Sequence, residues 1–209
     1  MATVTFKQDT VCNLAGNEIN CGDMAPEVTV VNCNPMLQNE VVGGAQENVQ
    51  LVVVVPSLDT PVCDAETRRF NVDAAALEGV TVTTVSMDLP FAAAKFCSTA
   101  GIENLKVCSD FRNKDFSNAY GMLLADGPLA GVTARAIFVI ARDGKVSYKE
   151  LVSEITAEPD YSAAIEAAKA AKIDLRELFI GESPFGVDKG NDEKPPVFID
   201  QMPAGSEGL

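Results

Sequence analysis

The chain of 209 residues carries a formal net charge of −14, and 47% of its residues are hydrophobic, enough for one sizeable domain with a packed core. Such an acidic chain is a poor partner for nucleic acid or for an anionic membrane surface. Its sequence contains no histidine, which excludes Ser-His-Asp and Cys-His catalysis in their usual forms, as well as His-ligated zinc.

The sequence shows no apolar run long enough to predict a membrane span, and its start lacks the charged and apolar regions of a signal peptide. We therefore expect a cytoplasmic protein, in which stable structural disulfides are uncommon. Free buried thiols, a metal site and redox chemistry are then the three explanations for the cysteines. The six cysteines are Cys12, Cys21, Cys33, Cys63, Cys97 and Cys108.

The N-terminal part of the chain predicts short strands. Residues 3–14 hold two apolar runs around Gln8 and Asp9, which indicates a β-hairpin. Residues 27–32 alternate as in a half-buried strand, and residues 34–44 combine turn residues with a short valine pair, which favours a loop and a sheet edge.

The most informative stretch, residues 51–70, reads LVVVVPSLDTPVCDAETRRF. Its valine run predicts a central strand, residues 50–55, that is buried on both faces. Thr60 followed by Pro61 is a helix-start signal. Cys63 then lies in the first helical turn, where free backbone N–H groups and the positive end of the helix dipole favour a thiolate.

The rest of the chain alternates between helices and strands up to an Asp-Gly hairpin at residues 142–144. This order predicts an α/β fold, with a mixed central sheet and helices on both faces, after the N-terminal β-hairpin. Helices are expected at 62–77, 91–100, 113–120 and 158–172, and strands at 80–86, 105–108, 134–141 and 145–152.

Residues 173–209 differ in composition from the chain before them, because glycine, proline and acidic residues are frequent there. That composition predicts a tail without a core of its own. We therefore expect one domain over residues 1–172 and an acidic C-terminal tail over residues 173–209.

Position alone leaves two interpretations of Cys63 open: a small buried hydrophobe, or an activated nucleophile at the end of a central strand. Without histidine, activation must come from the helix dipole, backbone N–H groups, a hydroxyl or an arginine. Thr60 offers a hydroxyl; its alternative role is that of the helix N-cap, and it can fill both roles. Arg135 offers a fixed cation, although a strand-end arginine is more often simply exposed. Pro56 and Pro61 shape the intervening turn.

The other cysteines give weaker signals. Cys97 lies on a short helix that can open at low cost, and a disulfide between two helices requires backbone movement. A buried free thiol is the alternative for this residue. The chain has no CxxC motif, so neither a Cys₄ zinc site nor a thioredoxin-type dithiol is expected. The remaining four, interpreted as structural, are Cys12, Cys21, Cys33 and Cys108.

Several segments resemble those of one known family. PSLDTPVC, which ends at Cys63, is similar to the P-x-x-x-T-x-x-C motif of peroxiredoxins. MDLPFAAAKFC, FRNKDFSNAYG, ADGPLAGVTARAIFVI and LVSEITAEPDY resemble, in the same order, segments of bacterial thiol peroxidases, which are atypical two-cysteine peroxiredoxins. The resemblance covers roughly residues 3–170.

The resemblance implies a thioredoxin-like fold with an N-terminal β-hairpin. It also implies that Cys63 is the peroxidatic nucleophile and Cys97 the resolving cysteine of the same chain. Thr60 and Arg135 would polarise the peroxide, and Pro56 would shield the pocket.

Further expectations come from the same resemblance: a homodimer, no metal or haem cofactor, recycling by thioredoxin, and a preference for alkyl hydroperoxides over hydrogen peroxide. The four extra cysteines and the tail depart from the family pattern. Two other functions remain open, a redox-sensing binding protein that uses Cys63 as its switch and a thiol-disulfide oxidoreductase. The absence of CxxC counts against the second of these.

Overall fold

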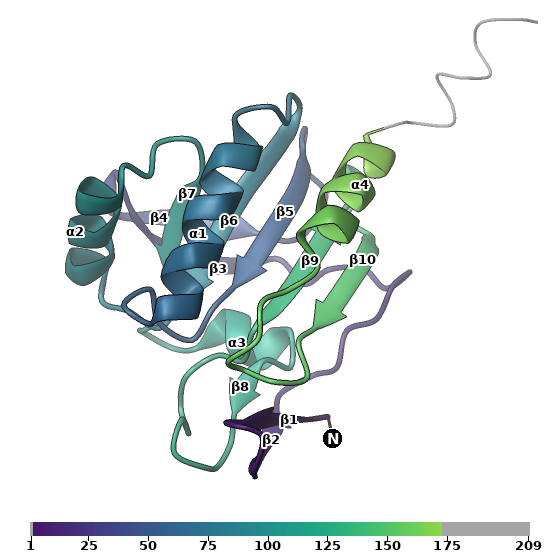
Figure 1. The fold of residues 1–209 in the computed structure, drawn as a ribbon. Coiled ribbons are helices and arrows are strands. Elements are labelled where there is room, and N and C mark those ends of the chain that lie inside the picture. The colour runs from purple at the N-terminus through teal and green to yellow at the C-terminus, as the bar shows by residue number, and fades with distance from the viewer. Residues whose placement is uncertain (1, 173–209) are drawn as a thin grey trace, which may run out of the picture. The chain divides into compact units, whose positions relative to one another are not determined.

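The computed structural model describes residues 2–172, so the tail predicted over residues 173–209 lies outside the described residues and the domain division stays a prediction. A seven-stranded sheet forms the centre (Figure 1). In spatial order its strands are β10 (Val146–Leu151), β9 (Ala136–Ile140), β5 (Val49–Val54), β6 (Val80–Ser86), β7 (Lys106–Ser109), β3 (Val28–Cys33) and β4 (Met36–Val42).

The middle of this sheet is parallel and largely buried. Strands β5, β6 and β7 run parallel, while β9 pairs antiparallel with β5 and β3 pairs antiparallel with β7. Every residue of β5 is buried, as its valine-rich sequence predicts for a strand covered on both faces. The predicted mixed sheet is therefore confirmed, and β5 ends at the turn that leads into α1 and Cys63.

Helices cover both faces of the sheet, as predicted. Helices α1 (Pro61–Ala74), α2 (Pro90–Ala100) and α4 (Tyr161–Ala171) lie on one face, where Phe70 and Ala93 join the core. The short helix α3 (Asp115–Ala119) lies on the other face, where Phe116 stacks on Tyr120 with ring centroids 4.3 Å apart. The site at the start of α1 is thus supported by two apolar layers.

The predicted N-terminal hairpin is present as β1 (Thr3–Phe6) and β2 (Thr10–Ala15). A two-residue strand, β8 (Leu123–Leu124), extends it to a three-stranded sheet that sequence reasoning missed. The hairpin also contacts the body of the protein, because the Thr5 N–H donates to the Ser153 carbonyl at 2.7 Å and the Ile155 N–H donates to the Thr5 carbonyl at 2.9 Å.

Two further comparisons with the predicted elements concern boundaries. Residues 34–44 form less loop than expected, because β4 is a seven-residue edge strand paired with β3. The first helix ends at Ala74 rather than residue 77, although Leu77 still reaches the core. Within residues 2–172, none of the helices combines the length and apolar composition that crossing a membrane requires.

Candidate active site

A strand, a turn and a helix position Cys63. The turn after β5 is held by Asp88, whose carboxylate accepts hydrogen bonds from the Ser57 hydroxyl at 2.7 Å and the Leu58 N–H at 2.8 Å. Thr60 occupies the N-cap position and Pro61 the first helical position, as predicted. The Thr60 hydroxyl does not cap the helix, because it donates to the Ser57 carbonyl at 3.1 Å.

Cys63 lies in the first turn of α1 and is completely buried. The first backbone hydrogen bond of this helix joins the Asp64 N–H to the Thr60 carbonyl at 2.9 Å. The N–H groups of Val62 and Cys63 have no hydrogen-bond partner among residues 2–172. A negative charge at the Cys63 sulfur would therefore meet both free donors and the positive end of the helix dipole.

Arg135 is the cation that faces this sulfur. Its Nη2 donates to Cys63 Sγ at 3.2 Å, and its Nε donates to the Ile155 carbonyl at 3.0 Å. The side chain is 1% exposed, whereas most arginines remain in solvent, and it stands at the start of β9 beside β5. The structure thus brings together two residues that lie 72 positions apart in the sequence.

Sequence reasoning missed Glu66, which is fully buried and forms an ion pair with Arg135 Nη1. Burial raises the pKa of Glu66 to about 7, although the charge of Arg135 opposes the shift. Burial acts to lower the pKa of Arg135, but the charges of Glu66 and Cys63 outweigh it and raise that pKa. The spacing gave a usable signal, because Glu66 lies one turn after Cys63 on the same helix face.

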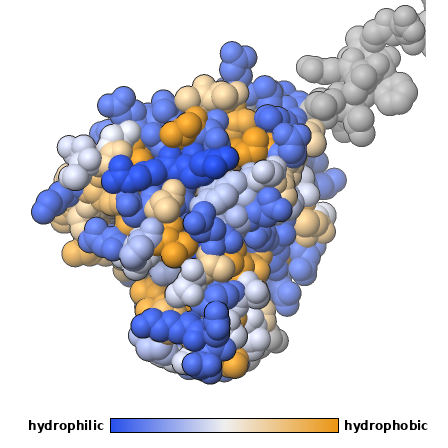
Figure 2. Space-filling view, viewed as in Figure 1, coloured by the Kyte–Doolittle hydropathy of each residue, from blue (hydrophilic) through white to orange (hydrophobic). Residues whose placement is uncertain are grey.

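A cavity of about 380 Å³ opens in front of this cluster, and among residues 2–172 Arg135 is the only charged residue in its wall. The predicted residues Pro56 and Thr60 line it as well. Figure 2 shows apolar surface above the β1–β2 hairpin, the part of the molecule that borders this cavity. The other lining residues are Phe6, Ser57, Pro61, Val62, Leu129, Val132, Ile155 and Thr156.

Cys97 is half-buried on α2, and it forms no disulfide with Cys63, since all six cysteines are free thiols. The end of α2 rests against the later turns of α1, not its first turn. Arg68 Nη1 donates to the Ala100 carbonyl at 3.0 Å, and Asn71 Nδ2 donates to the Gly101 carbonyl at 3.3 Å. A Cys63–Cys97 bond therefore requires α2 to rearrange.

The four extra cysteines lie apart from the Cys63 cavity. Cys12, Cys33 and Cys108 are buried and Cys21 is exposed. Burial raises the pKa of Cys33 to about 12 and that of Cys97 to about 11, and it raises the pKa of Cys108 as well. Within residues 2–172, acidic residues and cysteines form no cluster suited to holding a metal ion.

Comparisons with known proteins agree with this architecture. The Redoxin family model matches residues 20–165. The thiol peroxidase of Aquifex aeolicus is 50% identical over 167 residues, which cover 80% of this chain and 96% of that protein. The chain belongs to the thiol peroxidases of the redoxin family. The enzyme is also 49% identical to the thiol peroxidase of Halalkalibacterium halodurans, over 82% of this chain and 99% of that protein.

Solved structures support the same assignment and confirm the thioredoxin-like fold of the enzyme. A peroxiredoxin-like protein from Aquifex aeolicus matches with a TM-score of 0.78 and 47% identity, covering 82% of this chain and 98% of that one. A thiol peroxidase from Chromobacterium violaceum matches with a TM-score of 0.71 at 20% identity, which shows a shared fold.

Proposed function

We propose that this peroxiredoxin reduces hydroperoxides at Cys63 and that Cys97 resolves the oxidised sulfur within the same chain. The contact between Arg135 Nη2 and Cys63 Sγ at 3.2 Å carries the proposal. It places a fixed cation against a sulfur that already lies at a helix N-terminus. Both features stabilise a thiolate, and the thiolate is the nucleophilic form of cysteine.

In the first step the Cys63 thiolate attacks the distal oxygen of the peroxide. The O–O bond breaks, water or an alcohol leaves after taking up a proton, and Cys63 becomes a sulfenic acid. Arg135 and the free N–H groups of the first turn stabilise charge on the two oxygens, and the Thr60 hydroxyl joins them once it turns away from the Ser57 carbonyl. Pro56 lines the cavity and keeps water from the sulfur.

In the second step Cys97 attacks the sulfenic sulfur, so that a disulfide forms and water leaves. Burial raises the pKa of Cys97 to about 11 in the folded enzyme, which keeps this thiol unreactive until α2 opens. A dithiol reductant then restores both thiols, and we propose thioredoxin for this role.

The wall of the cavity favours organic substrates. Phe6, Leu129 and Val132 present apolar side chains to it, whereas Arg135 supplies a single fixed charge. Burial of an alkyl group there would strengthen binding by about 25 cal/mol per Å² of apolar surface. We therefore propose that alkyl hydroperoxides are better substrates than hydrogen peroxide. A homodimer in the cytoplasm is part of the same proposal.

The deciding measurement is NADPH-coupled turnover of cumene hydroperoxide with thioredoxin and thioredoxin reductase. Wild type should turn over, Cys63→Ser should show no activity, and Cys97→Ser should complete one turnover without being recycled. Cys21→Ser is the matched control, because that thiol is exposed and lies outside the cavity. Wild type that consumes peroxide only stoichiometrically would favour a redox sensor over an enzyme with thioredoxin turnover.

A further inference from the structure

A second cavity, of about 470 Å³, lies between elements that carry two cysteines far apart in the sequence. Cys33 at the end of β3 and Cys97 on α2 both line it. The two residues also pack in one apolar cluster, on the face of the sheet that α2 covers. Cys97 therefore faces the same cavity as a second thiol in the folded enzyme.

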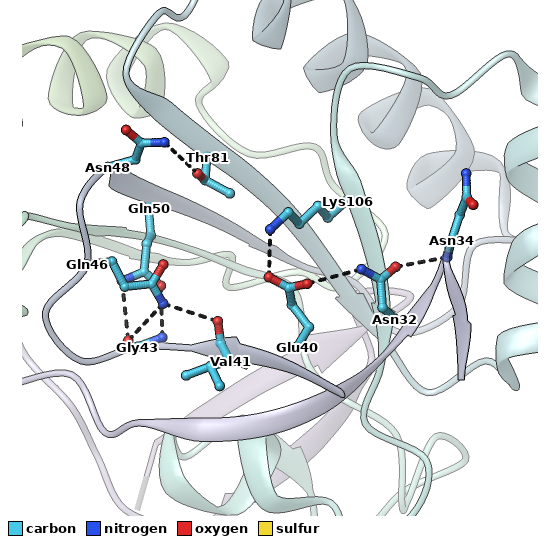
Figure 3. Close-up of polar contacts among 10 residues, drawn as sticks. All are labelled: Asn32, Asn34, Glu40, Val41, Gly43, Gln46, Asn48, Gln50, Thr81 and Lys106. Carbon is cyan, nitrogen blue, oxygen red and sulfur yellow. Dashed lines mark hydrogen bonds and ion pairs between the residues drawn. The ribbon is translucent and has the colours of Figure 1, made fainter. Parts of the chain in front are cut away.

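Cys33 is held in a rigid position. Lys106 and Asn32 both donate to Glu40, at 2.6 Å and 3.1 Å, and the Asn34 N–H donates to Asn32 Oδ1 at 2.8 Å (Figure 3). These bonds fix the residues on either side of Cys33 and tie three strands together. Movement between the two thiols must therefore come from α2.

Opening of α2 changes the reactivity of Cys33. The thiol is 1% exposed, and its burial is the largest cause that raises its pKa to about 12. Helix α2 supplies part of that cover, because Ala93 and Cys97 pack in the same cluster. When α2 opens so that Cys97 can reach Cys63, water reaches Cys33. The burial that raises the pKa of Cys33 is then reduced. Cys33 becomes a better nucleophile at the moment a disulfide to Cys97 exists.

We infer that Cys33 is a third redox-active thiol, which accepts Cys97 from the Cys63–Cys97 disulfide. This inference rests on the proposed function. The Cys33 thiolate, having released its proton to water, attacks Cys97 Sγ. The Cys33–Cys97 bond forms, the Cys63–Cys97 bond breaks, and Cys63 leaves as a thiolate with the electron pair. The number of disulfides is unchanged, so the exchange consumes no oxidant.

The exchange allows α2 to close again. A Cys33–Cys97 disulfide joins residues that line the same cavity in the folded enzyme, whereas a Cys63–Cys97 disulfide holds α2 away from its place. Cys63 returns in its reduced form to its contact with Arg135. One chain can then reduce two molecules of peroxide before any external reductant acts, the second leaving Cys63 as a sulfenic acid.

The test uses full-length, fully reduced enzyme with two equivalents of cumene hydroperoxide and no reductant. Wild type should consume two equivalents per chain, and peptide mapping should find Cys33 linked to Cys97. Cys33→Ala and Cys33→Ser should consume one equivalent and retain the Cys63–Cys97 disulfide. Cys108→Ala is the matched control, because Cys108 is equally buried but packs on the opposite face of the sheet, and it should behave as wild type.

The outcomes separate the two proposals. Consumption of one equivalent by wild type, with only a Cys63–Cys97 disulfide in the map, overturns the exchange and leaves the peroxidase mechanism intact. No consumption by wild type overturns the peroxidase mechanism itself. Mapping of wild type needs no variant to fold. Mass measurement must show that Cys63 sulfinic acid does not account for the second equivalent.

Discussion

Cys63, behind the wall of the first cavity, and Cys97, in the wall of the second, are held differently. Around Cys63, the groups come from the end of β5, the start of β9 and the first turns of α1, a helix with five buried residues, one of them Cys63. Around Cys97, one wall is α2, which has only Pro90 and Ala93 as buried residues. A helix with two fully buried residues opens at a lower free-energy cost than one held by five, as α1 is.

This difference suggests a division of labour. The first cavity is built before substrate arrives, so its charges lose little energy in reorganising during reaction. Under the proposed mechanism the second cavity has to open, because the Cys97 thiol must move to reach Cys63. The variants below separate the two properties, beginning with the largest expected effect.

Replacing Arg135 by Met should lower the second-order rate with cumene hydroperoxide about 10²–10³-fold, the loss typical when one donor to a developing charge is removed. The change leaves Glu66 as a buried unpaired carboxylate, so the double variant Arg135→Met/Glu66→Gln keeps the test valid if the single variant unfolds. Arg135→Lys should retain part of the rate, because it keeps the charge without the fork. Wild-type rates in the folded double variant would remove Arg135 from the site.

Glu66 should make stability depend on pH. Burial raises its pKa from 4.5 to about 7, so between these values the native state binds a proton that the unfolded chain has lost. The contribution to stability is therefore present at low pH, and it is lost as pH rises through about 7. The full difference amounts to about 3 kcal/mol.

Glu66→Gln removes this titration and keeps an oxygen that can accept from Arg135. Urea unfolding from about pH 5 to pH 8 should show a smaller fall in the free energy of unfolding for Glu66→Gln than for wild type, by up to about 3 kcal/mol. If the free energy of unfolding fell equally with pH in the two proteins, the raised pKa of Glu66 would be contradicted.

The smallest expected effect concerns the anchoring of α2. Arg68→Ala removes the bond from Arg68 Nη1 to the Ala100 carbonyl, and it should speed disulfide formation between Cys63 and Cys97 a few-fold by loosening α2. Its exposed ion pair with Asp64 should contribute less than about 1 kcal/mol to stability.

Arg69→Ala is the matched control for that experiment. Arg69 lies on the same helix and pairs with Asp73, but its guanidinium faces the ring of Tyr161 and not α2. In stopped-flow measurements, Arg69→Ala should therefore form the Cys63–Cys97 disulfide at the wild-type rate. Equal acceleration in both variants would show that general loosening of α1, not the anchor, sets the rate.

Local sequence patterns were sufficient to predict most of the fold. The valine run of β5 and the Thr60-Pro61 signal were sufficient for the strand, the turn and the helix start, because each depends on neighbouring residues. Strand β8 escaped prediction because two residues give no periodicity. Strand β4 was underestimated because most of its residues are exposed, so its sequence lacks the alternation of a half-buried strand.

The candidate site was less accessible to sequence reasoning. Position alone was equally consistent with a buried structural thiol at Cys63 and an exposed strand-end charge at Arg135. Their proposed roles came from the family resemblance. Glu66 was missed because a charged residue in an otherwise polar helix is normally solvated, and its burial depends on Arg135 arriving from β9. The neighbourhood of Cys33 and Cys97 depends on packing between α2 and β3, which no local pattern encodes.

The hydrogen bonds of Arg135 have a consequence for synthesis of the chain on the ribosome. Its Nε is oriented by the Ile155 carbonyl, and Ile155 is in turn held by Thr5. Thr5, which leaves the ribosome early, can therefore form these hydrogen bonds only after Ser153 and Ile155 have been synthesised. Until residues 153–155 have left the ribosome, Cys63 has no oriented arginine beside it. If Cys63 is the peroxidatic cysteine, as we propose, we expect the nascent chain to react with peroxide slowly until the fold closes.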